Sequence, residues 1–413
     1  MPDGEKIVVK SGKDGVTILN PDIDVAVIRF NSSKNYAVAT IGNYTTKGKQ
    51  WLFMTGFPGK DKSKQRLLTA GTVKAKDEAA FNIKDKYSME NENSTENGNE
   101  LVYTNQSSGG MSGGGVFDAE GRLGGVNTGS EDNYLGDKEV SWGYSLGVPI
   151  TTFLGIAEAA KFSTQNFPKV ANPAGEVNAN EIQQIKAQLF RFQIPQSGAE
   201  AADWVNYGNA LWRAGEYTEA VRAFDRAITL LGKEKKTENL ANIYYAKGLA
   251  LTDIGQSLIL TNNQKALEKH EEALTAFEQA TKTFSQFPNA WRRQGLIFYF
   301  LQRYPEALIA YEQAININAQ DFVPYVERGN VLQELKRYPE ALASYGEAIK
   351  LKPTHPWTYN NRGALYAEKG EKELALNDYN QAIQLDPQLD NAYYNCGNLY
   401  YKKGEKDWFY QSC

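Results

Sequence analysis

Ser112 lies in the stretch NQSSGGMSGGGVF, residues 105–117, which contains five glycines. Glycines leave the neighbouring backbone N–H groups open to close approach by a ligand, because no side chain obstructs them. Such a serine could contact a phosphate, attack a carbonyl group, or occupy a glycine-rich turn without chemistry. The types of the residues around Ser112 indicate which of these three interpretations fits.

Two motif-based interpretations of this stretch lack their structural context. A phosphate-binding loop needs a Lys after the glycines and a helix behind it, and neither follows Ser112. Residues 110–114 match G-x-S-x-G, but the nucleophile elbow of an α/β-hydrolase requires a helix directly after the serine. The sequence continues as VFDAEGRLGGVNTG, which predicts a strand, a turn and a second strand.

The composition changes near residue 160. Before it, short β-rich runs alternate with turn residues, which is typical of a β-barrel or sandwich and not of βαβ units. The runs are IDVAVIRF, WLFMTGFPG, LLTAGTVKA, ELVYTNQ, GGVFD, GRLGGVNTG and GYSLGVPI. The pattern of residues 151–162 predicts a helix that closes this domain, and residues 163–198 mix Pro, Asn and Gly. We therefore predict a β-domain over residues 1–162 and a linker over 163–198.

Residues 199–413 contain an internal repeat. Gly295, Gly329, Gly363 and Gly397 follow one another at a constant interval, which equals the period of the tetratricopeptide (TPR) repeat. With its helical pattern, this segment resembles that repeat, in which each unit is a pair of antiparallel helices. We expect about six units. The second carries an insertion within GQSLILTNNQKALEKHE, and the last is incomplete.

The residue types of the repeats fit close helix packing. Small residues such as Gly329, Ala341 and Ala348 allow the backbones to approach each other where two helices cross. We expect aromatic residues to fill the space between successive repeats; these are Tyr325, Tyr338 and Tyr345. Pro353 and Pro387 should end the second helix of their units.

The stretch GGMSGGGVFDAEGRLGGVNTG resembles the nucleophile loop and following hairpin of trypsin-like serine peptidases of the HtrA type. DVAVIRF, MTGFPG with LTAGTVKA, and GYSLGVPITTFL resemble further segments of that family, in the family's order. The resemblance implies a double β-barrel with Ser112 as nucleophile and an oxyanion hole formed by the N–H groups of Gly110 and Ser112. It places Gln106 at the base of the specificity pocket and Asp24 in the orienting role, for which Asp22 competes.

The sequence departs from this family in its histidines. The triad needs an imidazole that takes the serine proton, and in this family that histidine precedes the aspartate. None precedes Asp24, since the two histidines are His270 and His355. We expect these two to be a surface helix position and a turn residue. The fold class expected is therefore an all-β trypsin-like double barrel with an incomplete first barrel, truncated at its N-terminus, followed by an all-α TPR solenoid.

Two functions follow from these features. The first is a serine endopeptidase that cleaves peptide bonds through Ser112 and recruits substrates or partners with its repeats, although the chain as printed should have little or no turnover. The second is a non-catalytic scaffold that binds a peptide or protein partner on the concave face of the repeats and carries a relic peptidase domain. The resemblance places candidate contacts at Asn209, Arg292, Asn330, Asn360, Asn361 and Asn398. Asparagines there could bond a peptide backbone or be solvated surface.

The composition narrows the possible functional classes of the protein further. A formal net charge of −4 without a long basic run argues against nucleic-acid binding, and no apolar run is long enough for a membrane span. The two cysteines, Cys396 and Cys413, lack the spacing of metal ligands, so neither a metal nor an organic cofactor is expected. The N-terminus has no apolar signal segment. Relatives of this architecture are often exported, but the sequence leaves the compartment open.

Overall fold

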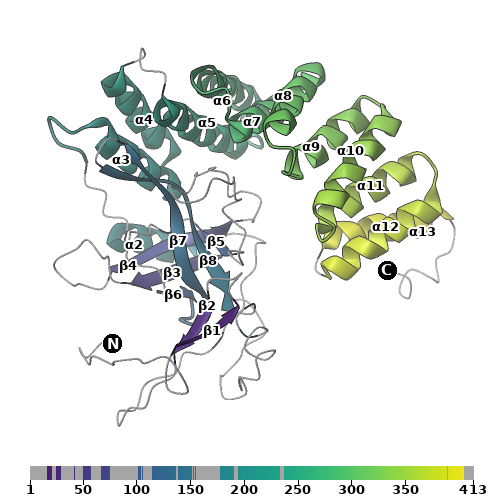
Figure 1. The fold of residues 1–413 in the computed structure, drawn as a ribbon, viewed down its shortest axis with the longest axis horizontal. Coiled ribbons are helices and arrows are strands. Elements are labelled where there is room, and N and C mark those ends of the chain that lie inside the picture. The colour runs from purple at the N-terminus through teal and green to yellow at the C-terminus, as the bar shows by residue number, and fades with distance from the viewer. Residues whose placement is uncertain are drawn as a thin grey trace, which may run out of the picture. The chain divides into compact units, whose positions relative to one another are not determined.

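A computed structural model describes most of the helical repeats and part of the β-domain. The described residues are 16–20, 25–28, 41, 50–56, 67–74, 101–103, 105, 114–135, 138–150, 152, 154, 177–189, 194–232, 237–387 and 389–403. The chain forms two compact units, Met1–Lys233 and Glu234–Cys413. The first unit holds the strands and the first helices, and the second holds the remaining helices (Figure 1).

Six strands of the first unit close into an antiparallel barrel in the order β3-β4-β5-β8-β7-β6, with β6 pairing back to β3. A separate two-stranded antiparallel sheet consists of β1 and β2. The strands are β1 (Val16–Asn20), β2 (Val25–Ile28), β3 (Trp51–Gly56), β4 (Leu67–Lys74), β5 (Leu101–Tyr103), β6 (Gly115–Asp118), β7 (Leu123–Leu135) and β8 (Lys138–Pro149). This arrangement confirms the expected all-β class of the N-terminal domain.

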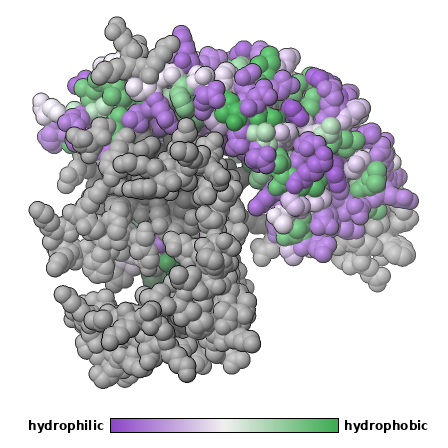
Figure 2. Space-filling view, in the orientation of Figure 1, coloured by the Kyte–Doolittle hydropathy of each residue, from purple (hydrophilic) through white to green (hydrophobic). Residues whose placement is uncertain are grey.

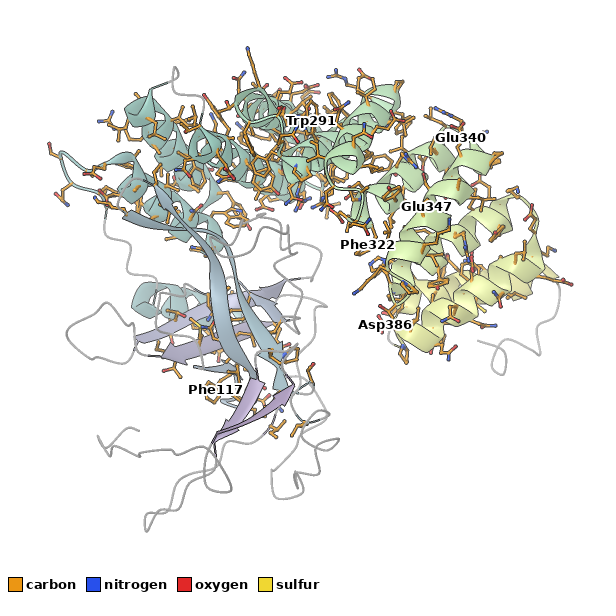
Figure 3. All side chains as sticks on the ribbon, in the orientation of Figure 1. Phe117, Trp291, Phe322, Glu340, Glu347 and Asp386 are labelled. Atoms are coloured by element: carbon orange, nitrogen blue, oxygen red, sulfur yellow. The ribbon has the colours of Figure 1, made fainter. Side chains whose placement is uncertain are left out.

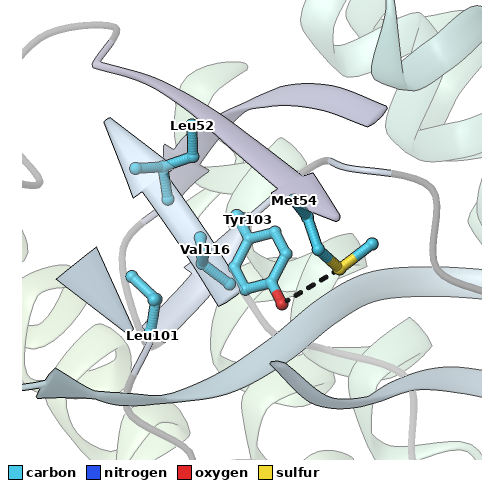
Figure 4. Packing of buried hydrophobic residues seen from close by; sticks show 5 residues of the cluster. All are labelled: Leu52, Met54, Leu101, Tyr103 and Val116. Atoms are coloured by element: carbon cyan, nitrogen blue, oxygen red, sulfur yellow. Dashed lines mark hydrogen bonds between the residues drawn. The ribbon is translucent and has the colours of Figure 1, made fainter. Parts of the chain in front are cut away.

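The barrel core follows from the alternation of residues along its strands, since every second side chain points inward. Leu52, Met54, Leu101, Tyr103 and Val116 form a cluster with no exposed surface (Figure 4). The Tyr103 hydroxyl lies 3.7 Å from the sulfur of Met54 and donates a hydrogen bond of 2.5 Å to Asn127 Oδ1. Burial raises the pKa of the Tyr103 phenol well above its ordinary value, so the hydroxyl stays a neutral donor.

All seven β-rich runs predicted from the sequence contain a strand, and β1 is an additional one. The main difference lies in β7 and β8, which continue far beyond the predicted segments as one long hairpin (Figure 1). The expected closing helix falls mostly outside the described residues. Of the residues there that the structure describes, Ile150, Thr152 and Leu154 are helical. Within the predicted linker, Ala179–Leu189 forms helix α2.

The described helices from α3 onward form five antiparallel pairs and a final helix, as expected for TPR units. The pairs are α3 (Ala201–Arg213) with α4 (Tyr217–Leu231), α5 (Glu238–Leu258) with α6 (Asn263–Thr283), α7 (Pro288–Phe300) with α8 (Tyr304–Ile317), α9 (Val323–Glu334) with α10 (Tyr338–Leu351), and α11 (Pro356–Glu368) with α12 (Lys372–Leu385), and the final helix is α13 (Asp390–Lys403). As predicted, α10 and α12 end shortly before Pro353 and Pro387.

One contact recurs inside the pairs: a glycine of the first helix meets an aromatic ring of the second. A Cβ at Gly329 would lie 2.5 Å from the Tyr345 ring, and one at Gly295 would lie 2.6 Å from the Tyr311 ring. The ring of Tyr345, which was expected to fill the space between repeats, packs on the glycine of its own pair. The rings of Tyr311 and Tyr345 are buried.

The inserted residues lengthen one helix pair. In the other pairs the aromatic residue follows its glycine at one constant spacing, as Tyr345 follows Gly329, whereas Phe277 lies much farther along the chain from Gly248. This added length matches the predicted insertion, and it makes α5 and α6 longer than the other helices. A second close approach forms in the extension, where a Cβ at Gly255 would lie 2.5 Å from the His270 ring.

Gly329→Ala and Gly346→Ala should have opposite effects on the stability of the repeats. Overpacking against Tyr345 should cost about 1–3 kcal/mol at Gly329. At Gly346 of α10 a Cβ meets nothing within 4 Å, so removing a mid-helix glycine should stabilise by about 0.5–1 kcal/mol. Urea titrations followed by helical circular dichroism measure both. Equal effects of the two substitutions would contradict the proposed role of the glycine contact.

Candidate functional site

Four predicted residues of the peptidase site, Ser112, Asp24, Gly110 and Gln106, lie outside the described residues. Their predicted roles are therefore untested by the geometry. The structure does describe the two residues that flank the segment 106–113, Asn105 and Gly114.

Asn105 is anchored in the barrel by three strands. Its Nδ2 donates hydrogen bonds to the carbonyl oxygens of Leu52 on β3 at 3.1 Å and Thr69 on β4 at 3.0 Å. Its own carbonyl oxygen accepts a 2.6 Å bond from the Ser145 hydroxyl on β8. Asn105 has no exposed surface. Buried hydrogen bonds of this kind are costly to break, so the chain enters the Ser112 segment from a fixed point.

The far end of this segment is also attached to the barrel. The Asn127 amide of β7 donates a 2.8 Å hydrogen bond to the Gly114 carbonyl oxygen. Beyond it, the β6–β7 turn is closed by Asp118, which accepts bonds from the backbone and side chain of Arg122 at 2.9 Å and 2.7 Å. The barrel thus holds both ends of the segment that contains Ser112.

The two histidines belong to the packing of the second unit. His270 is 3% exposed, and its ring stacks on Phe300 of α7 with centroids 5.4 Å apart. The expectation of a surface helix position for His270 is therefore wrong, because the inserted residues bring α5 across its ring. His355 lies at the N-terminal end of α11, where its Nδ1 is 2.8 Å from the Thr358 hydroxyl. Its ring centroid lies 4.8 Å from that of Phe322, the residue labelled in Figure 3.

Arg292, a predicted peptide contact, forms an ion pair inside the repeats. Its Nη1 lies 2.9 Å from Oε1 of Glu327 on α9, and the two side chains are 7% and 16% exposed. Burial raises the pKa of the Glu327 carboxyl above its ordinary value, while the guanidinium groups of Arg292 and Arg293 act in the opposite direction. The pair links the first helices of two successive repeats.

The predicted asparagines form hydrogen bonds across three successive first helices. Asn361 of α11 donates a 3.1 Å bond to Asn330 Oδ1 on α9, and Tyr345 donates a 2.8 Å bond to the same oxygen. Asn395 of α13 donates a 3.0 Å bond to Asn360 Oδ1 on α11. The Asn330 oxygen is thus occupied twice. Its Nδ2 group is left with two N–H donors that make no described bond.

The other two predicted asparagines have different surroundings. Asn209 on α3 has no exposed surface, whereas Asn398 on α13 is exposed. Asn209 lies in the first compact unit, and Asn398 lies in the second. The structure therefore brings Asn330 together with Asn361, and Arg292 with Glu327, but it does not connect all six candidates.

Two residues of this network, Glu327 and Asn395, escaped the sequence-based prediction. The repeat period contains the missing signal, because Glu327, Asn361 and Asn395 occupy the same position of three successive repeats.

The visible surface of the repeats is largely hydrophilic, with smaller hydrophobic patches between (Figure 2). Among the described residues, no group of three acidic, His or Cys side chains could hold a metal ion, and no helix has the length and apolarity to cross a membrane.

Comparisons with protein families assign the two parts of the chain separately. Residues 2–126 match the family described as a trypsin-like peptidase domain. Residues 197–235 and 262–322 match the tetratricopeptide repeat, and residues 329–370 and 365–404 match a second TPR family. Both resemblances predicted from the sequence are confirmed. No curated protein matches the sequence.

Solved structures that are similar to this chain include a TPR protein and several MamA proteins. The TPR protein YrrB, described as having an unusual peptide-binding site, is 24% identical, with 49% of this chain and 92% of that chain covered and a TM-score of 0.38. MamA from Desulfovibrio magneticus RS-1 is 18% identical, with 47% and 99% covered and a TM-score of 0.40.

His270 should make the helical repeats sensitive to acid. Burial lowers the pKa of its imidazole below the ordinary value of 6.5. Between the two values the unfolded chain binds more protons, so stability is full above about pH 6.5 and falls as the pH drops, by at most about 1.4 kcal/mol per pH unit. Urea titrations between about pH 7.5 and 5 should show this loss.

His270→Phe keeps a flat ring beside Gly255 without a titrating group. It should therefore remove the loss of stability in acid that the His270 imidazole causes. His355→Gln leaves the buried His270 ring in place, so this variant should retain the same loss of stability in acid. An acid sensitivity that survives His270→Phe unchanged would contradict the assignment.

Proposed function

Since the chain carries a trypsin-like peptidase domain followed by TPR repeats, we propose that it binds a peptide or protein partner with its repeats and does not turn over peptide bonds at Ser112. The observation that carries the proposal is the placement of the two imidazoles. Both are engaged in helix packing within the second unit, one buried against Phe300 and one beside Thr358.

The placement of the two histidines matters because of the chemistry of the catalytic triad. A serine hydroxyl is a weak nucleophile at neutral pH unless a base takes its proton. The printed sequence contains no histidine within residues 2–126. Turnover through Ser112 therefore requires an imidazole that this part of the sequence does not supply. Within the proposal, Ser112, Gly110, Asp24 and Gln106 keep the roles that the family resemblance implies, as a substrate-binding frame without its base.

The asparagine network supports a binding role for the repeats. Because the Asn330 oxygen accepts from both Tyr345 and Asn361, the amide is held in one orientation. Its Nδ2 donors can then meet the carbonyl oxygens of an extended peptide with little loss of side-chain entropy. We place Arg292 in a supporting role, since its guanidinium is paired with Glu327 and largely buried.

A fluorophosphonate probe should not label Ser112 in the full chain. Such probes react with serine hydroxyl groups that a neighbouring base has activated. The control is Ser112→Ala, which should give the same background by gel fluorescence and intact mass. Labelling that disappears in Ser112→Ala would contradict the proposal and support the peptidase hypothesis.

Asn330→Ala should weaken binding of linear peptides selected by the full chain from a phage-displayed random library. Loss of the oriented amide should cost about 1–2 kcal/mol, which corresponds to a Kd about 5- to 30-fold higher. Asn380→Ala, the same change at an exposed position of α12, is the matched control and should leave the Kd unchanged. If both variants retain full affinity, the selected peptides bind elsewhere.

A further inference from the structure

The part of the long β7–β8 hairpin that leaves the barrel has a defined extent. β6 pairs with β7 as far as Val126, and β5 pairs with β8 from Leu101↔Gly147 to Tyr103↔Ser145. Beyond these pairings, Asp132–Leu135 of β7 pairs with Lys138–Ser141 of β8. We call residues 130–135 and 138–141 the arm. Among the described strands, β7 and β8 have only each other as partners there.

A two-stranded hairpin is at best marginally stable in water, so an ordered arm needs an element to pack against. That element is α3, which packs against β8 within the first compact unit. Val140 has no exposed surface, although it lies in the arm and outside the barrel. Side chains alternate along a strand, so Val140 lies on the same face of β8 as Lys138. On the helix side, Val205 of α3 is also fully buried.

Lys138 joins this face of the arm to the start of α3. Its Nζ lies 2.8 and 2.9 Å from the two carboxylate oxygens of Asp203, and 3.4 Å from Glu200 Oε2. The hydrogen bond with Asp203 raises the pKa of the Lys138 amine and lowers the pKa of the Asp203 carboxyl. The pair is therefore fully charged at neutral pH.

The same two carboxylates cap α3. The Glu200 amide donates a 2.9 Å bond to Asp203 Oδ2, and the Glu200 side chain accepts in return from the Asp203 amide. Such a capping box satisfies N–H groups that the helix cannot bond itself. A lysine near a helix N-terminus is unfavourable by itself because the helix dipole is positive there. The two acidic groups offset this repulsion and make the helix start a partner for Lys138.

We propose that the arm and α3 form an intramolecular latch, which makes the first TPR helix pair a structural part of the trypsin-like domain. The arm is ordered while α3 is seated on it, and α3 gains order from the arm. This latch is independent of catalysis at Ser112 and of partner binding at Asn330. It joins the barrel to the first TPR helix pair by a packed contact in addition to the connecting chain.

Hydrogen exchange of the full chain, read by mass spectrometry, tests the latch. Lys138→Met keeps the aliphatic stem but removes the charge, and it should speed exchange about two- to fivefold in peptides from both the arm and α3. Val140→Ala removes buried surface and should speed exchange about tenfold or more in the same two elements. Peptides from α9–α12 should not change.

Lys350→Met is the matched control, because it removes another surface lysine that is ion-paired, with Glu347 at 2.6 Å. It should leave the exchange of the arm and α3 unchanged. If Val140→Ala speeds exchange in the arm alone, or in neither element, the arm and α3 are not coupled and the latch is wrong. The hydrogen-exchange result does not depend on fluorophosphonate labelling or on peptide binding. The latch and the proposed function can therefore fail independently of each other.

Discussion

Attack by a serine hydroxyl on a carbonyl group depends on a base that takes its proton. In this chain, both imidazoles take part in helix packing within the repeats. The buried His270 ring stacks on the Phe300 ring, and its Cδ2 and Nε2 atoms lie close to Gly255 of α5, where a proton would be costly. His355 is held at the start of α11 by Thr358 and Phe322. Since residues 2–126 contain no histidine, these two placements support the proposal that the trypsin-like domain is a binding frame.

The remainder of the structure is organised around close approaches that exclude side chains. Glycines of the first helices receive aromatic rings of the second helices, which sets the geometry of each pair. That regular spacing brings the first helices of successive repeats together, so that Arg292 reaches Glu327 and Asn361 reaches Asn330. In the barrel, the buried amide of Asn105 joins two strands instead, because its Nδ2 group donates to carbonyl oxygens of both β3 and β4.

The sequence predicted those features that have a period. Strand alternation located the barrel strands, and the constant glycine spacing located the repeats and the insertion. Contacts between distant residues could not be predicted in this way. The burial of His270 depends on how the inserted residues cross, and the contact of Lys138 with Asp203 joins positions 65 residues apart. The packing of Tyr345 on Gly329 was missed because the pattern gives the residue types and not their partners. The roles of Ser112 and Asp24 remain predictions from resemblance.

The most direct measurement is the hydrolysis of an activated ester, p-nitrophenyl acetate, by the full chain beside its Ser112→Ala variant at neutral pH. The account predicts equal slow rates for the two proteins and no burst of p-nitrophenol. A burst that requires Ser112, followed by steady turnover, would show that a base reaches this hydroxyl and would contradict the account.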